Sequence, residues 1–428
     1  MRVIHNATLA DGRIRDVRID PNRGVIDAVG ESLETTGPDV TTIDATGKRL
    51  LPGMIDVHVH AREPGFPHKE TWETATQSAA AGGVTTVVDQ PNTEPPTIDG
   101  AGFDEKATHA ADAYVDYGIN GGVTADWDPA SLFDRSLFAL GEVFLADSTG
   151  DMGIETELFG DAIDRAAKAG VTVTVHAEDA DQFDERARDR NDADAWSAYR
   201  TAEAEKVAIE QACSVAAESD VDLHIAHTST PEGIDAAVAG GATCEVCPHH
   251  LFLSRDDLEG LGTFGRMNPP LRSESRRSAV YDRVADGTVD MIATDHAPHT
   301  RTEKDASIWE APSGVPGVET ALPLLLEEAR QGNLSYEQVR DLTAANPADV
   351  FDLPQKGRIE AGRDADLVLV DPDARQPIRG EALHSKATWT PFEGLSAVFP
   401  EWTMVRGQQV YDRDTDEFGP AIGTNVRS

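Results

Sequence analysis

Eight apolar segments alternate with helical segments between residues 51 and 354, and this rhythm constrains the fold more than any other feature of the chain. Intervening segments such as 155–170 and 201–219 carry apolar residues at helical spacing. Eight strands that alternate with helices predict a (β/α)8 TIM-like barrel. The expected strands are 51–60, 84–90, 114–120, 138–146, 171–176, 221–227, 243–247 and 289–295.

The two ends of the chain have a different texture from the middle. The first fifty residues alternate apolar and polar positions between the turn signals LADGR, DPNRG and DATGKR. The same pattern returns after about residue 355, in GRIEAGRDADLVLVD and MVRGQQVYD. We therefore expect 1–50 and 355–428 to pair into one small β-sandwich domain beside a barrel of residues 51–354.

The charge of the chain is strongly negative. The formal net charge is −39 and the isoelectric point is near 4.5, with acidic residues spread along the whole sequence. Such a field repels phosphates, so a nucleic-acid partner is not expected. A solvated acidic surface suits a high-salt cytoplasm such as that of a halophilic archaeon, where salt screens the repulsion between like charges.

Neither a membrane nor a secretory pathway is indicated by the sequence. The chain has no run of about 18 apolar residues, which a membrane span requires. The first residues, MRVIHNATLADGRIRD, lack the apolar core of a signal peptide. These features predict a cytoplasmic protein without a membrane partner.

Metal-binding side chains stand at the carboxyl ends of the predicted strands. His58 and His60 end the first strand, His176 the fifth, His227 the sixth and Asp295 the eighth. In a (β/α)8 barrel these ends form one rim, where the chemistry of this fold takes place. Imidazole and carboxylate groups are common metal ligands. Five such groups on one rim predict a metal centre.

A set of motifs along essentially the whole chain resembles the amidohydrolase superfamily, and within it the cyclic-amide hydrolases. The resemblance implies two divalent metal ions, with Zn²⁺ as the expected metal and His58, His60, His176, His227 and Asp295 among their ligands. The motifs are PGMIDVHVHARE, DQPNTEPP, TVHAED, IAHTST, CPHHL, MNPPLR, ATDHAPH, SGVPGVET and HSKATWTPFEG.

Among these hydrolases the chain most resembles the dihydroorotases. HAR after the first strand, PNT after the second and NPPLR after the seventh are the motifs that favour them. Dihydroorotases interconvert L-dihydroorotate and N-carbamoyl-L-aspartate in pyrimidine (UMP) synthesis, so the expected partner is a small-molecule substrate. An allantoinase or hydantoinase and a non-catalytic scaffold are the alternatives, and assembly as a homo-oligomer stays open.

The fourth strand departs from the pattern of these relatives. Two-metal members often bridge the ions with a carbamylated lysine there, but this chain has no lysine between Lys106 and Lys168. Alignment of the apolar core of GEVFLADSTG puts Glu142 at that position. A carboxylate has two oxygens and can bridge two ions, which favours Glu142. Asp147, which is nearer the strand end, and a site with one metal are the alternatives.

The resemblance also implies how the reaction proceeds. Metal ions lower the pKa of a water so that hydroxide is available near neutral pH. Asp295 is expected to take the proton of the nucleophile and to pass it to the departing amide nitrogen.

The substrate carries a carboxylate, which Arg62 can bind with its planar fork unless it forms a surface salt bridge. Asn92 is expected to contact this carboxylate or the ring, and His299 to donate to the carboxylate. Asn268 is expected to help, although an N-P-P turn alone favours asparagine. The further residues expected to line the substrate site are His60, Ser313 and Gly314, the last two within a glycine-rich segment that offers backbone amides or moves as a lid.

Overall fold

Eight parallel strands form the centre of the computed structural model, which describes residues 1–34, 40–145 and 152–428. Three strands pair in the order β6-β7-β8, and five more pair in the order β9-β11-β12-β13-β14. Parallel bridges Gly121–Leu140 and Val59–His296 join the two groups at both edges and close the barrel. The strands are β6 (Met54–Val59), β7 (Val84–Asp89), β8 (Asp116–Ile119), β9 (Leu140–Leu145), β11 (Val173–Ala177), β12 (Leu223–Ile225), β13 (Thr243–Val246) and β14 (Met291–Ile292), with β10 (Gly153–Ile154) beside β9.

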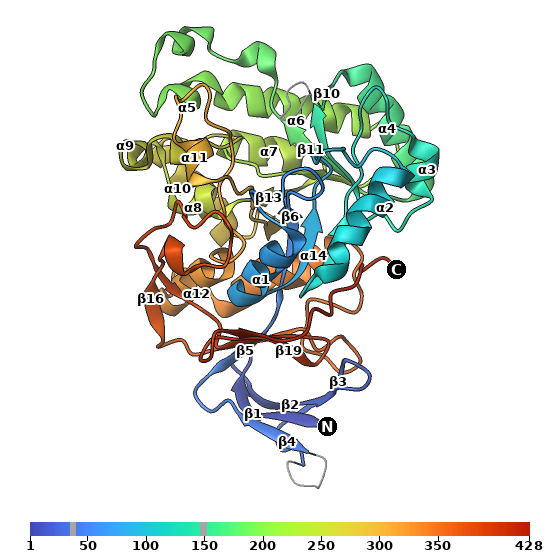
Figure 1. Cartoon of the computed structure of the whole chain (residues 1–428), viewed down its shortest axis with the longest axis vertical. Coiled ribbons are helices and arrows are strands. Elements are labelled where there is room, and N and C mark those ends of the chain that lie inside the picture. The colour runs from blue at the N-terminus through green and yellow to red at the C-terminus, as the bar shows by residue number, and fades with distance from the viewer. Residues whose placement is uncertain (35–39, 146–151) are drawn as a thin grey trace.

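Helices surround these strands (Figure 1). Helix α1 shows why they begin and end where they do: the Thr71 hydroxyl accepts a hydrogen bond from the Thr74 backbone N–H, and Gly83 ends the helix with φ of 84°. The helices are α1 (Trp72–Gly82), α2 (Gly100–His109), α3 (Pro129–Phe133), α4 (Thr156–Ala169), α5 (Ala195–Tyr199), α6 (Ala202–Ala216), α7 (Pro231–Ala239), α8 (Pro248–Phe252), α9 (Leu258–Leu261), α10 (Glu274–Ala285), α11 (Arg301–Lys304), α12 (Ala321–Gln331), α13 (Tyr336–Arg340) and α14 (Asn346–Val350).

The predicted strand 51–60 is wrong in extent, because two strands of different sheets share that apolar run. Strand β5 (Arg49–Pro52) pairs with β15 (Leu367–Val370), whereas β6 pairs with β7. The switch falls at Gly53, where a Cβ would lie 2.1 Å from the side chain of Thr85. Both strands are buried, so hydropathy alone does not separate them.

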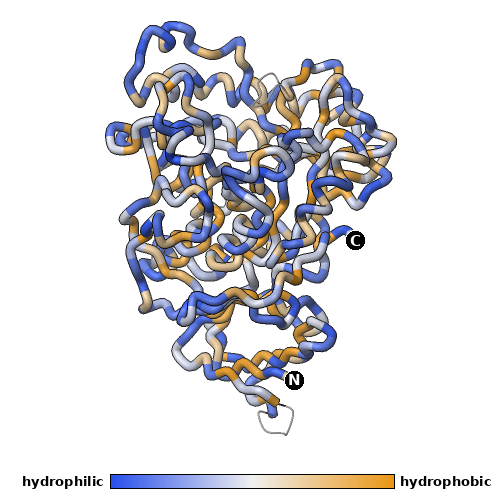
Figure 2. Tube along the Cα trace, viewed as in Figure 1, coloured by the Kyte–Doolittle hydropathy of each residue, from blue (hydrophilic) through white to orange (hydrophobic). Residues whose placement is uncertain are grey.

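Both ends of the chain contribute to a second sheet of nine strands. The N-terminal and C-terminal halves meet in the antiparallel pair β5–β15, where Leu50 lies opposite Leu369. The sheet bends into two layers below the barrel, with an apolar core that includes Ile4, Ile26 and Met404 (Figures 1 and 2). Its other strands are β1 (Arg2–Thr8), β2 (Ile14–Asp20), β3 (Val25–Gly30), β4 (Thr41–Asp44), β18 (Trp402–Val405), β19 (Gln408–Asp412) and β20 (Glu417–Phe418), and a separate pair consists of β16 (Arg375–Pro377) and β17 (Ser396–Val398).

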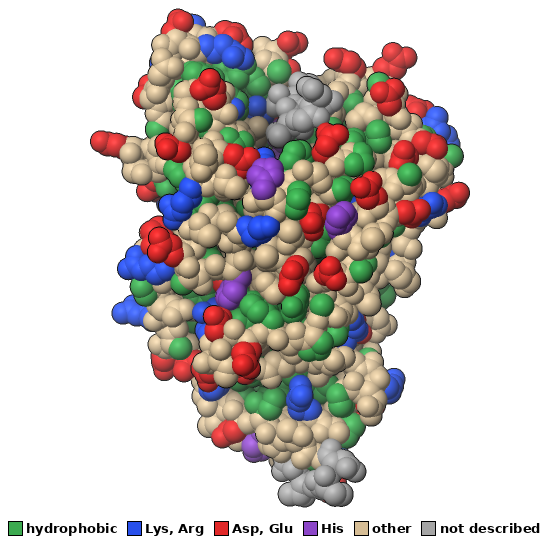
Figure 3. Space-filling view, viewed as in Figure 1, with side chains coloured by type: hydrophobic (Ala, Val, Ile, Leu, Met, Phe, Trp, Pro, Cys, Tyr) green, Lys and Arg blue, Asp and Glu red, His purple; other side chains and the backbone are tan. Residues whose placement is uncertain are grey.

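The surface bears the charge that the composition predicts. Acidic side chains are scattered over the face shown in Figure 3 and do not gather in one place. Across the described ranges, no helix combines the length and the apolar character that crossing a bilayer requires.

A buried ion network joins the barrel to the bent sheet. The Nζ of Lys356 lies 2.8 Å from Asp116 Oδ2 in β8, and 2.6 Å and 3.2 Å from carboxylate oxygens of Asp366 and Asp364 beside β15. Arg406 is a second cation on Asp116. Since Lys356 and Asp116 are almost inaccessible, salt in the solvent screens this network weakly.

We expect Lys356→Met to destabilise the fold by about 3–5 kcal/mol, because it leaves buried carboxylates without their shared cation. Lys48→Met is the matched control: Lys48 lies 2.5 Å from Glu401 in a half-exposed pair. Loss of an exposed pair costs less than about 1 kcal/mol. Thermal unfolding in molar KCl measures both, and equal losses would contradict the role given to the network.

Candidate metal centre and substrate pocket

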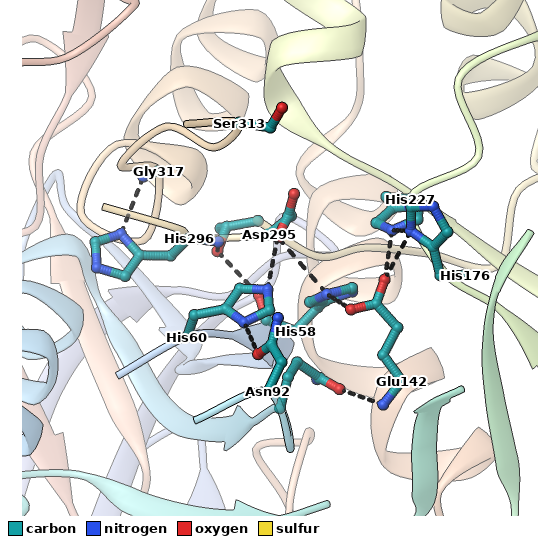
Figure 4. A network of polar contacts seen from close by, with 12 residues as sticks. His58, His60, Asn92, Glu142, His176, His227, Asp295, His296, Ser313 and Gly317 are labelled. Atoms are coloured by element: carbon teal, nitrogen blue, oxygen red, sulfur yellow. Dashed lines mark hydrogen bonds and ion pairs between the residues drawn. The ribbon is translucent and has the colours of Figure 1, made fainter. Parts of the chain in front are cut away.

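Six buried side chains from five barrel strands meet at the carboxyl ends of those strands (Figure 4). His227 and Asp295 lie just beyond β12 and β14, with φ of 35° and 46°, in the left-handed region. None of the six is more than 6% exposed. These residues are His58, His60, Glu142, His176, His227 and Asp295.

Glu142 lies between two groups of histidines. Its Oε1 is 2.7 Å from His227 Nε2 and 3.1 Å from His176 Nδ1. Its Oε2 faces the other way, 3.4 Å from His58 Nε2. Two sets of three potential ligands, one with His58 and His60 and one with His176 and His227, share Glu142 as their common member. The carboxylate thus connects two adjacent ligand sets.

Asp295 completes the side of the cluster that contains His58 and His60. Its Oδ1 lies 3.0 Å from His60 Nε2 and 3.7 Å from His58 Nε2. Burial raises the pKa of Asp295, but the His60 hydrogen bond and the nearby imidazoles outweigh it and lower that pKa below its ordinary value. The carboxylate is therefore ionised at neutral pH and can accept a proton.

The cluster fits divalent metal ions. His58 Nε2 is buried and has no hydrogen-bond partner among the described residues, although the carboxylates of Glu142 and Asp295 lie 3.4 Å and 3.7 Å away. An unpaired nitrogen that faces two carboxylates is the arrangement that a cation completes. The predicted alternative bridge, Asp147, lies outside the described residues.

Two carboxylates that the sequence analysis missed hold the histidines from behind. Glu245 Oε1 accepts from His58 Nδ1 at 2.6 Å and from the His227 backbone N–H at 3.0 Å. Glu178 Oε2 lies 3.4 Å from His176 Nε2 and 2.5 Å from Arg200. Burial raises the pKa of both acids, but the neighbouring cations outweigh it and lower both. Acidic residues within the predicted strand TCEV and after the strand in HAED are the signal that could have identified them.

A pocket opens onto this cluster. Arg62, which is 7% exposed, contributes its guanidinium to the wall and lies 3.2 Å from His299 Nε2. Burial lowers the pKa of Arg62 to about 10, so the side chain is still charged at neutral pH. The lining residues are His60, Arg62, Asn92, Glu142, Phe144, His176, His227, Asn268, Asp295, Ala297, Ser313 and Gly314.

His299 is not one of these lining residues and lies behind the wall, in contact with Arg62 and Ser313. Its Nε2 lies 2.9 Å from the Ser313 carbonyl oxygen, and Lys69 Nζ lies 3.3 Å from its Nδ1. Burial and the charges of Arg62, Lys69 and Lys304 lower the pKa of His299 well below its ordinary value. The ring is therefore neutral. Since the Lys69 ammonium only donates and the Ser313 carbonyl oxygen only accepts, Nδ1 accepts and Nε2 donates.

The other residues expected at the substrate site face the pocket together. His60 Nδ1 lies 2.8 Å from Asn92 Oδ1, so a predicted metal ligand contacts a predicted substrate-binding residue. Gly314 has φ of 125°, and a Cβ there would lie 2.6 Å from the Ala297 carbonyl oxygen. Only glycine fits this close approach without strain.

The fold and this site define a class of protein. Residues 49–410 match the model of the Amidohydrolase family, and the chain belongs to that family. It is 68% identical to a dihydroorotase of Halobacterium salinarum over the full length of both chains. It is 42% identical to a dihydroorotase of Methanosarcina acetivorans, with 99% of this chain and 93% of the relative covered.

Solved structures agree on the fold. An L-hydantoinase (dihydropyrimidinase) from Arthrobacter aurescens superposes with a TM-score of 0.92 at 27% identity, covering 99% of this chain and 98% of that one. A dihydropyrimidinase from Brevibacillus agri gives 0.88 at 27% identity, covering 100% and 98%. These comparisons confirm the predicted fold class and the resemblance to the dihydroorotases.

Glu245→Gln should weaken metal binding about 10- to 100-fold, because the amide no longer pairs as an anion with the His58 N–H. Glu327→Gln is the control: Glu327 in α12 is also buried and lies 2.6 Å from Arg330, and no histidine is among its partners in the described residues. Chelator competition measures the affinity of each variant. Equal affinities would show that Glu245 does not support the metal ligands.

Proposed function

We propose that this chain is a dihydroorotase, which reversibly hydrolyses the cyclic amide of L-dihydroorotate to N-carbamoyl-L-aspartate in pyrimidine synthesis. The observation that carries the proposal is the pairing, in one pocket, of the Arg62 cation with the buried histidine–carboxylate cluster. The cluster suits amide hydrolysis, and the cation suits a substrate with a carboxylate. The 68% identical dihydroorotase supports this substrate.

Two divalent ions, Zn²⁺ in our proposal, would be held by the six clustered residues. His58, His60 and Asp295 would hold one ion, His176 and His227 the other, and Glu142 both. When bound, such ions polarise a carbonyl and lower the pKa of a water. The two oxygens of Glu142, each directed at a different set of histidines, support the bridging role.

Asp295 handles the proton in this scheme. Its carboxylate is ionised and borders the pocket, so it can accept the proton of the attacking water as the new C–O bond forms. It then delivers that proton to the amide nitrogen as the ring C–N bond breaks. In the reverse direction the carbamoyl nitrogen attacks the side-chain carboxyl carbon and Asp295 takes its proton; as the C–O bond breaks, Asp295 passes the proton to the departing oxygen, which leaves as water.

Arg62 and the two asparagines would hold the substrate. Arg62 offers a charged fork to the carboxylate, while Asn92 and Asn268 offer amide groups beside it. His299 would act mainly through Ser313, whose carbonyl oxygen it contacts. Ser313 and Gly314 would close the far side of the ring.

The acidic composition supports work in a high-salt cytoplasm. Light scattering in molar salt decides whether the enzyme acts as a homo-oligomer.

Glu142→Gln should lose one of two metal equivalents, since a neutral amide balances two dications poorly. Metal analysis of the purified protein measures this loss. Wild-type activity should also be independent of added bicarbonate, because no lysine carbamate has to form. Asp147→Asn is the control, and metal loss in that variant with none in Glu142→Gln would transfer the bridge to Asp147.

Arg62→Ala should lower kcat/KM for L-dihydroorotate by the equivalent of about 2–5 kcal/mol, since the carboxylate loses its buried partner. Allantoin and hydantoin lack this carboxylate and are assayed in molar KCl as comparison substrates for L-dihydroorotate. Wild-type turnover of either of these in preference to L-dihydroorotate would point to an allantoinase or hydantoinase. An unchanged kcat/KM in the variant would remove Arg62 from the substrate site.

A further inference from the structure

A tryptophan outside the catalytic cluster contacts one wall of the pocket. Trp196 lies in α5, within the long segment between β11 and α6. Its indole Nε1 is 3.0 Å from Asn268 Oδ1 and 3.2 Å from the Met267 carbonyl oxygen. Trp309 packs edge-on against its ring, with 5.8 Å between the centroids. The indole N–H is thus directed at the residue pair that includes a pocket asparagine.

The hydrogen bond from the Trp196 indole fixes the orientation of the Asn268 amide. An indole N–H only donates, so the atom of Asn268 that faces Trp196 has to be the amide oxygen. The Nδ2 group makes no hydrogen bond with any described residue and is not among the buried unpaired atoms. Because Asn268 lines the pocket and its oxygen faces Trp196, its NH₂ group is the part of the amide that faces the pocket.

The same tryptophan is fixed from the other side by Arg266. The guanidinium carbon of Arg266 lies 3.7 Å from the centre of the Trp196 ring, and its Nε donates to Ser313 Oγ at 3.2 Å. Lys304 Nζ donates to the carbonyl oxygens of Arg266 and Pro312, both at 2.9 Å. Two pocket residues, Asn268 and Ser313, are therefore held by one packed unit behind the wall.

We infer that Trp196 is a positioning residue that holds the Asn268 amide with its NH₂ group toward the substrate, and so makes this wall select a ligand oxygen. The inference rests on the proposed function for the identity of the substrate. With Arg62 also in the lining, the pocket presents donors to carbonyl and carboxylate oxygens. A ligand that places an N–H against Asn268 meets a second donor and is disfavoured.

Trp196→Phe tests this role, because phenylalanine keeps an aromatic ring under Arg266 but removes the donor. We expect the KM for L-dihydroorotate to rise about tenfold as the amide loses its fixed orientation, with kcat within about threefold of wild type. Trp309→Phe is the matched control: its indole donates to the Arg190 carbonyl oxygen at 2.8 Å, so KM should stay unchanged. Thermal unfolding and metal content verify that both variants fold.

A double-mutant cycle separates positioning from general packing. In an Asn268→Ala background, Trp196→Phe should raise KM no further, because the amide that it orients is gone. An equal further rise, or no rise in the single variant, would overturn the inference while leaving the dihydroorotase assignment intact.

Asn268→Asp tests the donor face directly. The carboxylate keeps an oxygen toward Trp196 but presents a negative oxygen to the pocket, so KM should exceed that of Asn268→Ala. A KM at or below the alanine value would overturn the inferred orientation. A wild type that does not hydrolyse L-dihydroorotate would overturn the proposed function and this inference together.

Discussion

The balance of charge in a dry barrel rim is the constraint on which the rest of this structure depends. Glu142, Asp295 and Glu245 are all buried, and each has a carboxylate oxygen within 3.7 Å of a ring nitrogen of His58. A buried carboxylate without a partner costs several kcal/mol, so each of these acids needs an imidazole or a cation in contact. The protein meets this need by arranging the histidines around the acids. The same arrangement leaves His58 Nε2 without a hydrogen-bond partner in the described part of the chain, while it faces the carboxylates of Glu142 and Asp295, and this makes the rim a place for cations.

Much of this arrangement could be predicted from the sequence, because strand ends map onto one rim. The alternation of apolar strands and helices predicted the barrel, and the histidines at 58, 60, 176 and 227 follow from their places along it. Because the sequence has no lysine between Lys106 and Lys168, it predicted Glu142 as the carboxylate that bridges the ions. The pattern did not reveal the split at Gly53, since apolar residues continue through a strand of each sheet.

What the sequence did not reveal depends on contacts between distant segments. Glu245 contacts His58 across 187 residues of sequence, and Trp196 reaches Asn268 across 72. No local periodicity marks such pairs, because a buried acid in a strand and an aromatic residue in a short helix have many other uses. Their partners become visible only when the barrel is closed and the loops are packed over it.

The scarcity of lysine extends the argument from the rim to the whole molecule. The chain has only eight lysines against 76 acidic residues, yet three of them lie in the interior. Lys106 pairs with Asp89, Lys356 with three aspartates, and Lys304 with backbone carbonyl oxygens behind the pocket. Molar salt screens pairs on the surface, so a cation there adds little to stability. A buried cation is shielded from that screening. Of the three buried lysines, Lys106 and Lys304 hold a strand end and loops beside the site, and Lys356 joins the barrel to the bent sheet.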